Sequence, residues 1–168
     1  MERVTGKMDE LQPAGACLRV ACARELAAFV GTELAPGGWR SVTQGEIDAF
    51  IAATGDRNWI HCDTARAAGE LAGGRTIVPG QLLLALIPGL LQEIYEVTEA
   101  GQAYAVALNR VRFRHMVHPG DMFRLCAVLD RVSERRSFVQ VDASCRLELM
   151  SRQRVLTMER SDVFLTRG

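Results

Sequence analysis

Two side chains that can exchange protons lie close together in the segment GDRNWIH, residues 55–61. Asp56 and His61 could share one water molecule, with one side chain withdrawing a proton and the other returning one, which is general acid–base catalysis. The same residues also fit a purely structural interpretation, in which Asp56 caps a turn and His61 forms a hydrogen bond with a backbone carbonyl. The spacing alone leaves both interpretations open.

Asn58 and Trp59 lie between these two residues. Asn is a common turn former, and its side chain can satisfy backbone groups of a loop, so Asn58 either forms a turn or positions the segment that presents His61. Trp59 would be an apolar wall beside the pair.

A second candidate lies in TIVPGQLLLAL, residues 76–86. Gly80 is expected at the start of a buried helix, where unpaired N–H groups and the helix dipole favour negative charge. A thioester carbonyl placed there would be polarised as in an oxyanion hole. The structural alternative is that Pro79 and Gly80 only form the turn into the helix.

Other combinations of reactive residues are weaker. Cys62 follows His61, but neighbours in an extended segment point to opposite sides, which argues against a Cys–His nucleophile. His115 and His118 have no carboxylate or thiol at a metal-ligand spacing. There is no Gly-rich phosphate-binding loop either. We therefore expect a site without a metal ion and without a bound cofactor.

The elements that position these residues can be predicted from their patterns. Thr43 and Glu46 form a capping-box pattern at the start of a helix that closes near Gly55. Asp63 can cap a short helix over 64–71, and the stretch 56–62 between the two is expected to be irregular or extended. We also expect a short helix over 23–34 and a brief strand over 39–42.

The segment 79–97 is apolar nearly all round, which predicts a buried helix that Pro88 kinks or splits. After residue 102 the pattern changes to long strands with short turns between them. These strands predict an antiparallel meander wrapped around the helix, and hence an α+β fold. The predicted strands cover 103–113, 121–132, 137–149 and 152–165.

Composition limits the class of protein. The 168 residues suit one domain over 23–168, preceded by an N-terminal extension over 1–22 that need not be ordered. Twenty basic and twenty acidic residues give zero net charge, so nothing predicts nucleic-acid binding, and self-association is compatible with this balance. Five scattered cysteines indicate free thiols in a cytoplasmic protein. The longest apolar run, QLLLALIPGLL, is too short to span a membrane.

Three segments together resemble the MaoC-like dehydratase family, which includes the (R)-specific enoyl-CoA hydratases. They are FIAATGDRNWIHCD, GGRTIVPGQLLLALIPGLL and ALNRVRFRHMVHPGD, and they occur in the order that the family has. The resemblance runs from about Glu25 to the C-terminus, and Trp59 after Asn58 looks most similar to the NodN-like branch. It implies a hot dog fold, in which an antiparallel sheet wraps around one long helix, in a homodimer or a dimer of dimers.

The resemblance also implies a reaction, the reversible hydration of trans-2-enoyl-CoA to (R)-3-hydroxyacyl-CoA without metal or redox cofactor. Asp56 and His61 match the catalytic pair that activates the water, and Gly80 matches the glycine whose N–H meets the thioester oxygen. Asn58 matches the loop Asn between the pair. We expect the acyl-CoA substrate to contact Asn58 and also Trp59, Val78 and Gln81.

Three departures from the family's pattern affect the expected substrate. Pro79 and Gln81 stand where the family usually has His and an apolar or aromatic residue, and Pro88 aligns with a serine that some hydratases carry. Two alternative functions remain open. One is an acyl-CoA thioesterase on the same fold, in which the carboxylate directs water at the thioester carbonyl. The other is an acyl-thioester-binding protein without catalysis.

Overall fold

The computed structural model describes residues 15–165 and has a four-stranded antiparallel sheet at its centre. The sheet confirms the α+β class and the four long strands. Its order is β3-β6-β5-β4. The strands are β3 (Ala103–Phe113), β4 (Phe123–Glu134), β5 (Phe138–Leu149) and β6 (Arg154–Leu165).

The predicted simple meander is therefore wrong for β3, which pairs with β6 and not with β4. The free side of β4 is instead occupied by the segment 31–40. Backbone N–H groups of this segment donate to carbonyls of β4, from Gly31 to Leu129 (2.8 Å) and from Leu34 to Ala127 (3.0 Å). The opposite edge of the sheet, β3, has no backbone partner on its outer side among the described residues.

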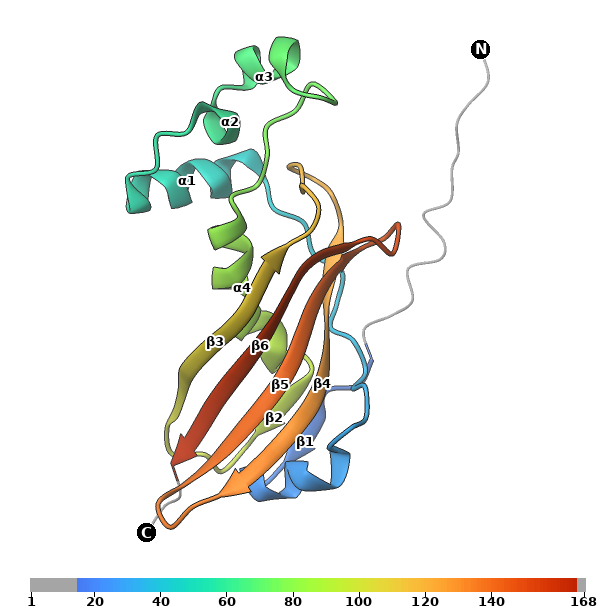
Figure 1. Cartoon of the computed structure of the whole chain (residues 1–168), viewed down its shortest axis with the longest axis vertical. Helices are drawn as coiled ribbons and strands as arrows, with labels where there is room; N and C mark the ends of the chain where they lie inside the picture. Colours follow the sequence, from blue (N-terminus) through green and yellow to red (C-terminus); the bar gives the residue numbers. More distant parts are fainter. Residues whose placement is uncertain (1–14, 166–168) are drawn as a thin grey trace.

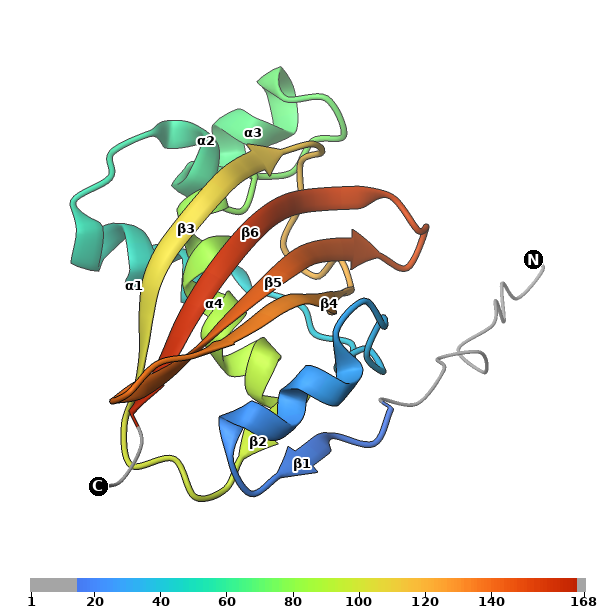
Figure 2. The ribbon, with the colours of Figure 1, turned by 60° about the horizontal axis from the view of Figure 1, so that its bottom comes forward.

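Helix α4 (Gly80–Gln92) lies on the concave side of the sheet, and Figure 2 shows the strands curving over it. One face of the helix packs into the core through Leu82, Leu83, Ile87, Leu90 and Leu91. Residues on its other face, such as Ala85 and Pro88, are exposed, so the helix is not buried all round as its composition suggested.

Two details of the predicted helix are also corrected. Pro88 does not split the helix, which is one element and ends at Gln92. Tyr95–Val97 forms a strand, β2, that pairs in parallel with β1 (Leu18–Val20). The helix ends before the predicted residue 97 because Tyr95 pairs with Leu18 and is buried. These contacts between segments distant in sequence override the local helical pattern.

The N-terminal part is more ordered than expected. Strand β1 lies within the stretch that was predicted as an extension, while residues 1–14 lie outside the described residues. The helix predicted over 23–34 is a 3-10 helix, η1 (Ala23–Phe29). The predicted strand over 39–42 is reduced to an isolated bridge between Arg40 and Phe123.

Three short helices gather at one end of the sheet, beside the start of α4 (Figure 1). The capping box of α1 (Gln44–Thr54) is confirmed, and Gly55 ends this helix with a left-handed φ of 73°. Asp63 caps α3 (Thr64–Glu70) as predicted. The stretch between them is not simply irregular, because α2 (Trp59–Cys62) forms there. Within residues 15–165, no helix is long and apolar enough to cross a membrane.

Candidate active site

The turn after α1 brings Asp56 and His61 face to face. Gly55 ends α1, Asp56 follows in the turn, and His61 lies on α2. The Nε2 atom of His61 is 3.9 Å from Oδ2 of Asp56. The imidazole is almost buried, with 11% of its side chain exposed, while the carboxylate is 36% exposed. The pair is therefore open to solvent mainly from the side of Asp56.

The second polar atom of each side chain is held by the backbone. The N–H of Asn58 donates to Oδ1 of Asp56 (2.9 Å), which fixes the carboxylate in the turn. Nδ1 of His61 lies 2.6 Å from the carbonyl oxygen of Ile77. Because a carbonyl only accepts, Nδ1 must carry the hydrogen, and in the neutral ring Nε2 keeps its lone pair.

The contacts that the structural interpretation predicted for Asp56 and His61 are thus both present, yet each uses only one of the two polar atoms. The other two atoms, Oδ2 and Nε2, face one another at a distance too long for a direct hydrogen bond. Two acceptors at this separation can both bind the hydrogens of one water molecule. The geometry therefore suits a water held between a carboxylate and a neutral imidazole.

Two contacts hold α2 against the approach to α4. The N–H of Ile77 donates to the carbonyl of Ile60 (2.9 Å). The carbonyl of the same residue accepts the hydrogen bond from Nδ1 of His61. Ile77 lies three residues before Gly80, which is the first residue of α4. The catalytic candidates on the two helices are therefore tied together through one short backbone segment.

The N–H of Gly80 is free to bind a ligand. The carbonyl of Pro79 accepts from the N–H groups of Leu82 (3.0 Å) and Leu83 (3.2 Å), so Pro79 closes the first turn of the helix. No acceptor among residues 15–165 contacts the N–H of Gly80, as expected for a first-turn position. Val78, just before this turn, is buried, and its N–H donates to the carbonyl of Val117 (2.8 Å).

Phe113, at the end of β3, stands directly over Gly80. A Cβ atom added at Gly80 would lie 2.6 Å from Cε1 of Phe113, which is a severe clash. The ring itself is half exposed. Phe113 was not among the residues predicted from the sequence, because only the folded sheet brings the end of β3 onto the start of α4.

A polar network behind the pair was also missed. The amide of Gln44 donates to the carbonyl of His61 (2.8 Å) and accepts from the hydroxyl of Thr76 (2.6 Å). Nδ1 of His118 lies 2.8 Å from the carbonyl oxygen of Thr76. This network links α1, α2 and the loop before β4. The capping box predicted the position of Gln44 in the first turn of a helix, but nothing in the sequence pointed to its partners.

The other predicted residues have the following positions. The side chain of Asn58 accepts from the N–H of Ile60 (3.4 Å) and caps α2, and the guanidinium of Arg66 lies 3.9 Å over the ring of Trp59. Gln81 and Cys62 are exposed. Within the described part of the chain, no group of three or more His, Cys, Asp or Glu residues could hold a metal ion.

Comparisons with known proteins identify the family and the fold. The family described as MaoC like domain matches residues 25–148. The chain is 38% identical over 128 residues to 3-hydroxyacyl-thioester dehydratase Z of Mycobacterium tuberculosis, which covers 74% of this chain and 83% of that protein. It is 35% identical over 96 residues to nodulation protein N of Rhizobium leguminosarum bv. viciae, covering 56% of this chain and 60% of that protein.

A solved structure extends the comparison to three dimensions. The (R)-hydratase from A. caviae involved in PHA biosynthesis superposes with a TM-score of 0.65 at 25% identity, over 79% of this chain and 94% of that chain. The sheet curved around α4 is thus the hot dog fold that this hydratase shares. With the family match over most of the sequence, the chain belongs to the MaoC-like dehydratase family.

Proposed function

We propose that the protein interconverts trans-2-enoyl-CoA and (R)-3-hydroxyacyl-CoA, using Asp56 and His61 to activate water. The observation that carries this proposal is the 3.9 Å separation of His61 Nε2 and Asp56 Oδ2, together with the hydrogen bond that ties His61 to Ile77, three residues before Gly80. Names of relatives support the class of reaction, since one is a 3-hydroxyacyl-thioester dehydratase and another an (R)-hydratase.

In the hydration direction, a water donates hydrogen bonds to Oδ2 of Asp56 and Nε2 of His61. As its oxygen attacks C3 of the enoyl group, one proton passes to this pair. Electron density moves onto the thioester oxygen, where the N–H of Gly80 and the start of α4 stabilise the developing negative charge. The pair then returns a proton to C2, so that water is added across the double bond without a net change in the protein.

The substrate contacts follow from the same placement. Gln81 is exposed beside Gly80, so its amide is available to a polar group near the thioester. Asn58 supports the site by capping α2. Trp59 supplies partly exposed apolar surface, and Val78, buried in the core, holds the segment that leads to Gly80. We assign these four residues to substrate binding, with Asn58 acting through the position of His61 and Val78 through the position of Gly80.

An assay with crotonyl-CoA separates this function from the two alternatives. Loss of the enoyl absorbance without release of free thiol is the result expected for a hydratase. Release of free thiol at the rate of substrate consumption would identify a thioesterase instead. Saturable binding of enoyl-CoA, with no turnover at any acyl chain length, would mean that the protein binds acyl thioesters without catalysing a reaction.

We further propose a homodimer formed through β3. This edge strand carries three large apolar side chains, Tyr104, Val106 and Leu108, each about half exposed. An open, apolar edge strand is a ready template for pairing with another strand. Pairing of β3 with the same strand of a second copy would bury these side chains and continue the sheet across the two chains. Two such dimers could associate further into a dimer of dimers.

A further inference from the structure

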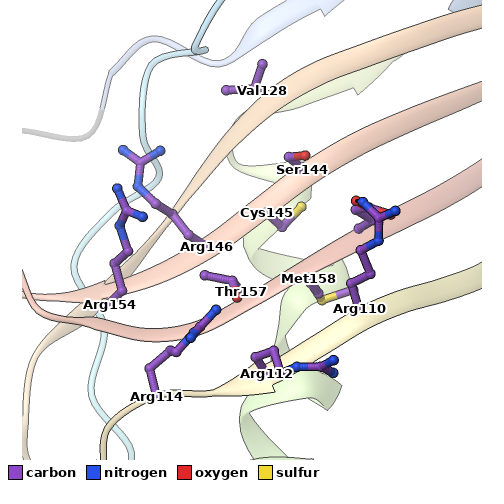
Figure 3. Close-up of a pocket in the computed structure, with 11 residues that line it drawn as sticks. Arg110, Arg112, Arg114, Val128, Ser144, Cys145, Arg146, Arg154, Thr157 and Met158 are labelled. Carbon is purple, nitrogen blue, oxygen red and sulfur yellow. The ribbon is translucent and has the colours of Figure 1, made fainter.

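A groove lined by arginines lies on the face of the sheet that points away from α4 (Figure 3). It has a volume of about 500 Å³. Its floor is formed by outward-facing residues of β5 and β6, such as Ser144 and Thr157, and five of the chain's twenty basic residues surround it. We call it the arginine groove, and its basic residues are Arg110, Arg112, Arg114, Arg146 and Arg154.

Most of this positive charge is not neutralised by residues 15–165. Arg110 forms an ion pair with Glu159 (2.8 Å), and Arg146 forms one with Glu33 (2.6 Å). The other three arginines have no carboxylate partner among residues 15–165, and all three are exposed. A protein with zero net charge therefore concentrates unpaired positive charge in one hollow. Such a concentration is a binding surface for an anion.

A bulge in β3 contributes to this concentration. Asn109 pairs with Glu159 and Arg112 pairs with Thr157, so β3 has one residue more than β6 in this interval. Arg110 takes a positive φ of 51° there. The extra residue lets Val111 pack against the core while Arg110 reaches Glu159 on the outer face. Bulges commonly re-aim side chains at functional places in a sheet.

The groove and the candidate active site lie on opposite sides of the same strand end. Phe113 points inward and stands over Gly80. Because side chains alternate along a strand, Arg112 and Arg114 point to the outer face. A ligand that passes around the end of β3 can therefore have its thioester at Gly80 and its distant end in the arginine groove.

We propose that the arginine groove binds the phosphate groups of the CoA part of the substrate. This assignment rests on the proposed function. Planar guanidinium groups bind phosphate oxygens with two parallel hydrogen bonds, which makes arginine well suited to this task. The proposal gives a role to a charged surface that the acid–base pair and Gly80 do not use.

The test compares two substrates that differ only in the carrier. Crotonyl-CoA carries phosphate groups, and crotonyl-N-acetylcysteamine has the same thioester without them. Arg112 and Arg154 are the residues to change, because neither forms an ion pair among the described residues. In Arg112→Ala and Arg154→Ala, we expect the ratio of kcat/KM for the CoA substrate to that for the truncated one to fall about 10-fold, mainly through KM.

Two further variants sharpen the comparison. Arg154→Lys keeps the charge but loses the planar fork, so its ratio should lie between those of the parent and Arg154→Ala. Arg136→Ala removes an exposed arginine from the turn between β4 and β5, outside the groove, and its ratio should equal that of the parent.

The outcomes separate the two proposals. If the parent hydrates both substrates and the Arg112 and Arg154 variants keep its ratio, the groove does not bind the carrier phosphates. A groove that serves an acidic protein partner would give this result. If the parent hydrates neither substrate, the proposed function is wrong, and the assignment of the groove to CoA falls with it.

Discussion

At the scale of single residues, Asp56 and His61 each use one polar atom to hold the local structure, which leaves the other for the proposed chemistry. The backbone N–H of Asn58 and the carbonyl of Ile77 hold one atom of each side chain. These contacts orient the remaining atoms, Oδ2 and Nε2, toward one another. Holding catalytic groups in position before the substrate binds removes an entropic cost from the reaction. A residue that looks like a turn former can therefore also be part of an acid–base pair.

Gly80 offers a test at this scale. A methyl group at this position would meet the ring of Phe113, and since the ring is half exposed, it should swing outward and not unfold the protein. We expect Gly80→Ala to lower kcat/KM for crotonyl-CoA by about 10-fold or more, because small displacements of positioning groups are costly. The double variant Gly80→Ala/Phe113→Ala should recover part of the loss. Full activity of Gly80→Ala would contradict this account of the clash.

At the scale of elements, local signals were sufficient where a few neighbouring residues decide the structure. The capping residues Thr43 and Glu46 predicted the start of α1, and the capping residue Asp63 predicted the start of α3. Alternating side chains predicted the four long strands. Local sequence patterns gave the wrong structure, or none, where contacts between segments distant in sequence determine it. The pairing of β2 with β1 shortened the predicted helix, and the contacts of Phe113 and Thr76 in the site depend on strands and loops that meet only in the folded chain.

The capping box is predicted to stabilise the element that holds the site. The side chain of Thr43 accepts from the N–H of Glu46 (3.2 Å), and α1 carries Gln44, which binds the carbonyl of His61. Replacing Thr43 by Ala should lower the free energy of unfolding by about 1 kcal/mol. Chemical denaturation at neutral pH measures this. Thr32→Ala, in an exposed segment without a cap, is the matched control, and an equal loss in both variants would refute the role of the cap.

The cap should also make stability depend on pH. The pKa of Glu46 is lowered because the backbone N–H and the hydroxyl of Thr43 donate to its carboxylate. A carboxyl whose pKa is lower in the folded state stabilises the fold above its usual pKa, and the contribution disappears as the pH falls through the folded value. The stability difference between the parent and Glu46→Gln should therefore shrink on acidification below about pH 4.5. A difference that stays constant down to about pH 3 would contradict this.

At the scale of the whole molecule, the two edge strands of the sheet differ in whether another segment covers them. The segment 31–40 covers β4, whereas no segment within residues 15–165 pairs with the outer side of β3, which carries exposed apolar side chains. The sequence predicted the strands, but it could not predict which edge would remain free, because that depends on the order β3-β6-β5-β4. The free edge is what supports the proposed homodimer.

A charged residue on that edge should separate the two copies. We expect Val106→Lys to convert a dimer into a monomer in sedimentation velocity experiments, since charges on edge strands oppose strand pairing. Val30→Lys, at an apolar residue of similar exposure outside the sheet, should leave the dimer intact. A dimer that persists in Val106→Lys would place the interface elsewhere.

The most direct test of the central claim is the rate of crotonyl-CoA hydration by variants of the acid–base pair. Asp56→Asn and His61→Ala should each lower kcat by about 10²- to 10⁴-fold, the usual contribution of a general acid or base. Glu99→Gln, at an exposed carboxylate in the turn after β2, should keep the parent's rate. If Asp56→Asn and His61→Ala, both folded, hydrate crotonyl-CoA as fast as the parent, Asp56 and His61 are not the catalytic pair.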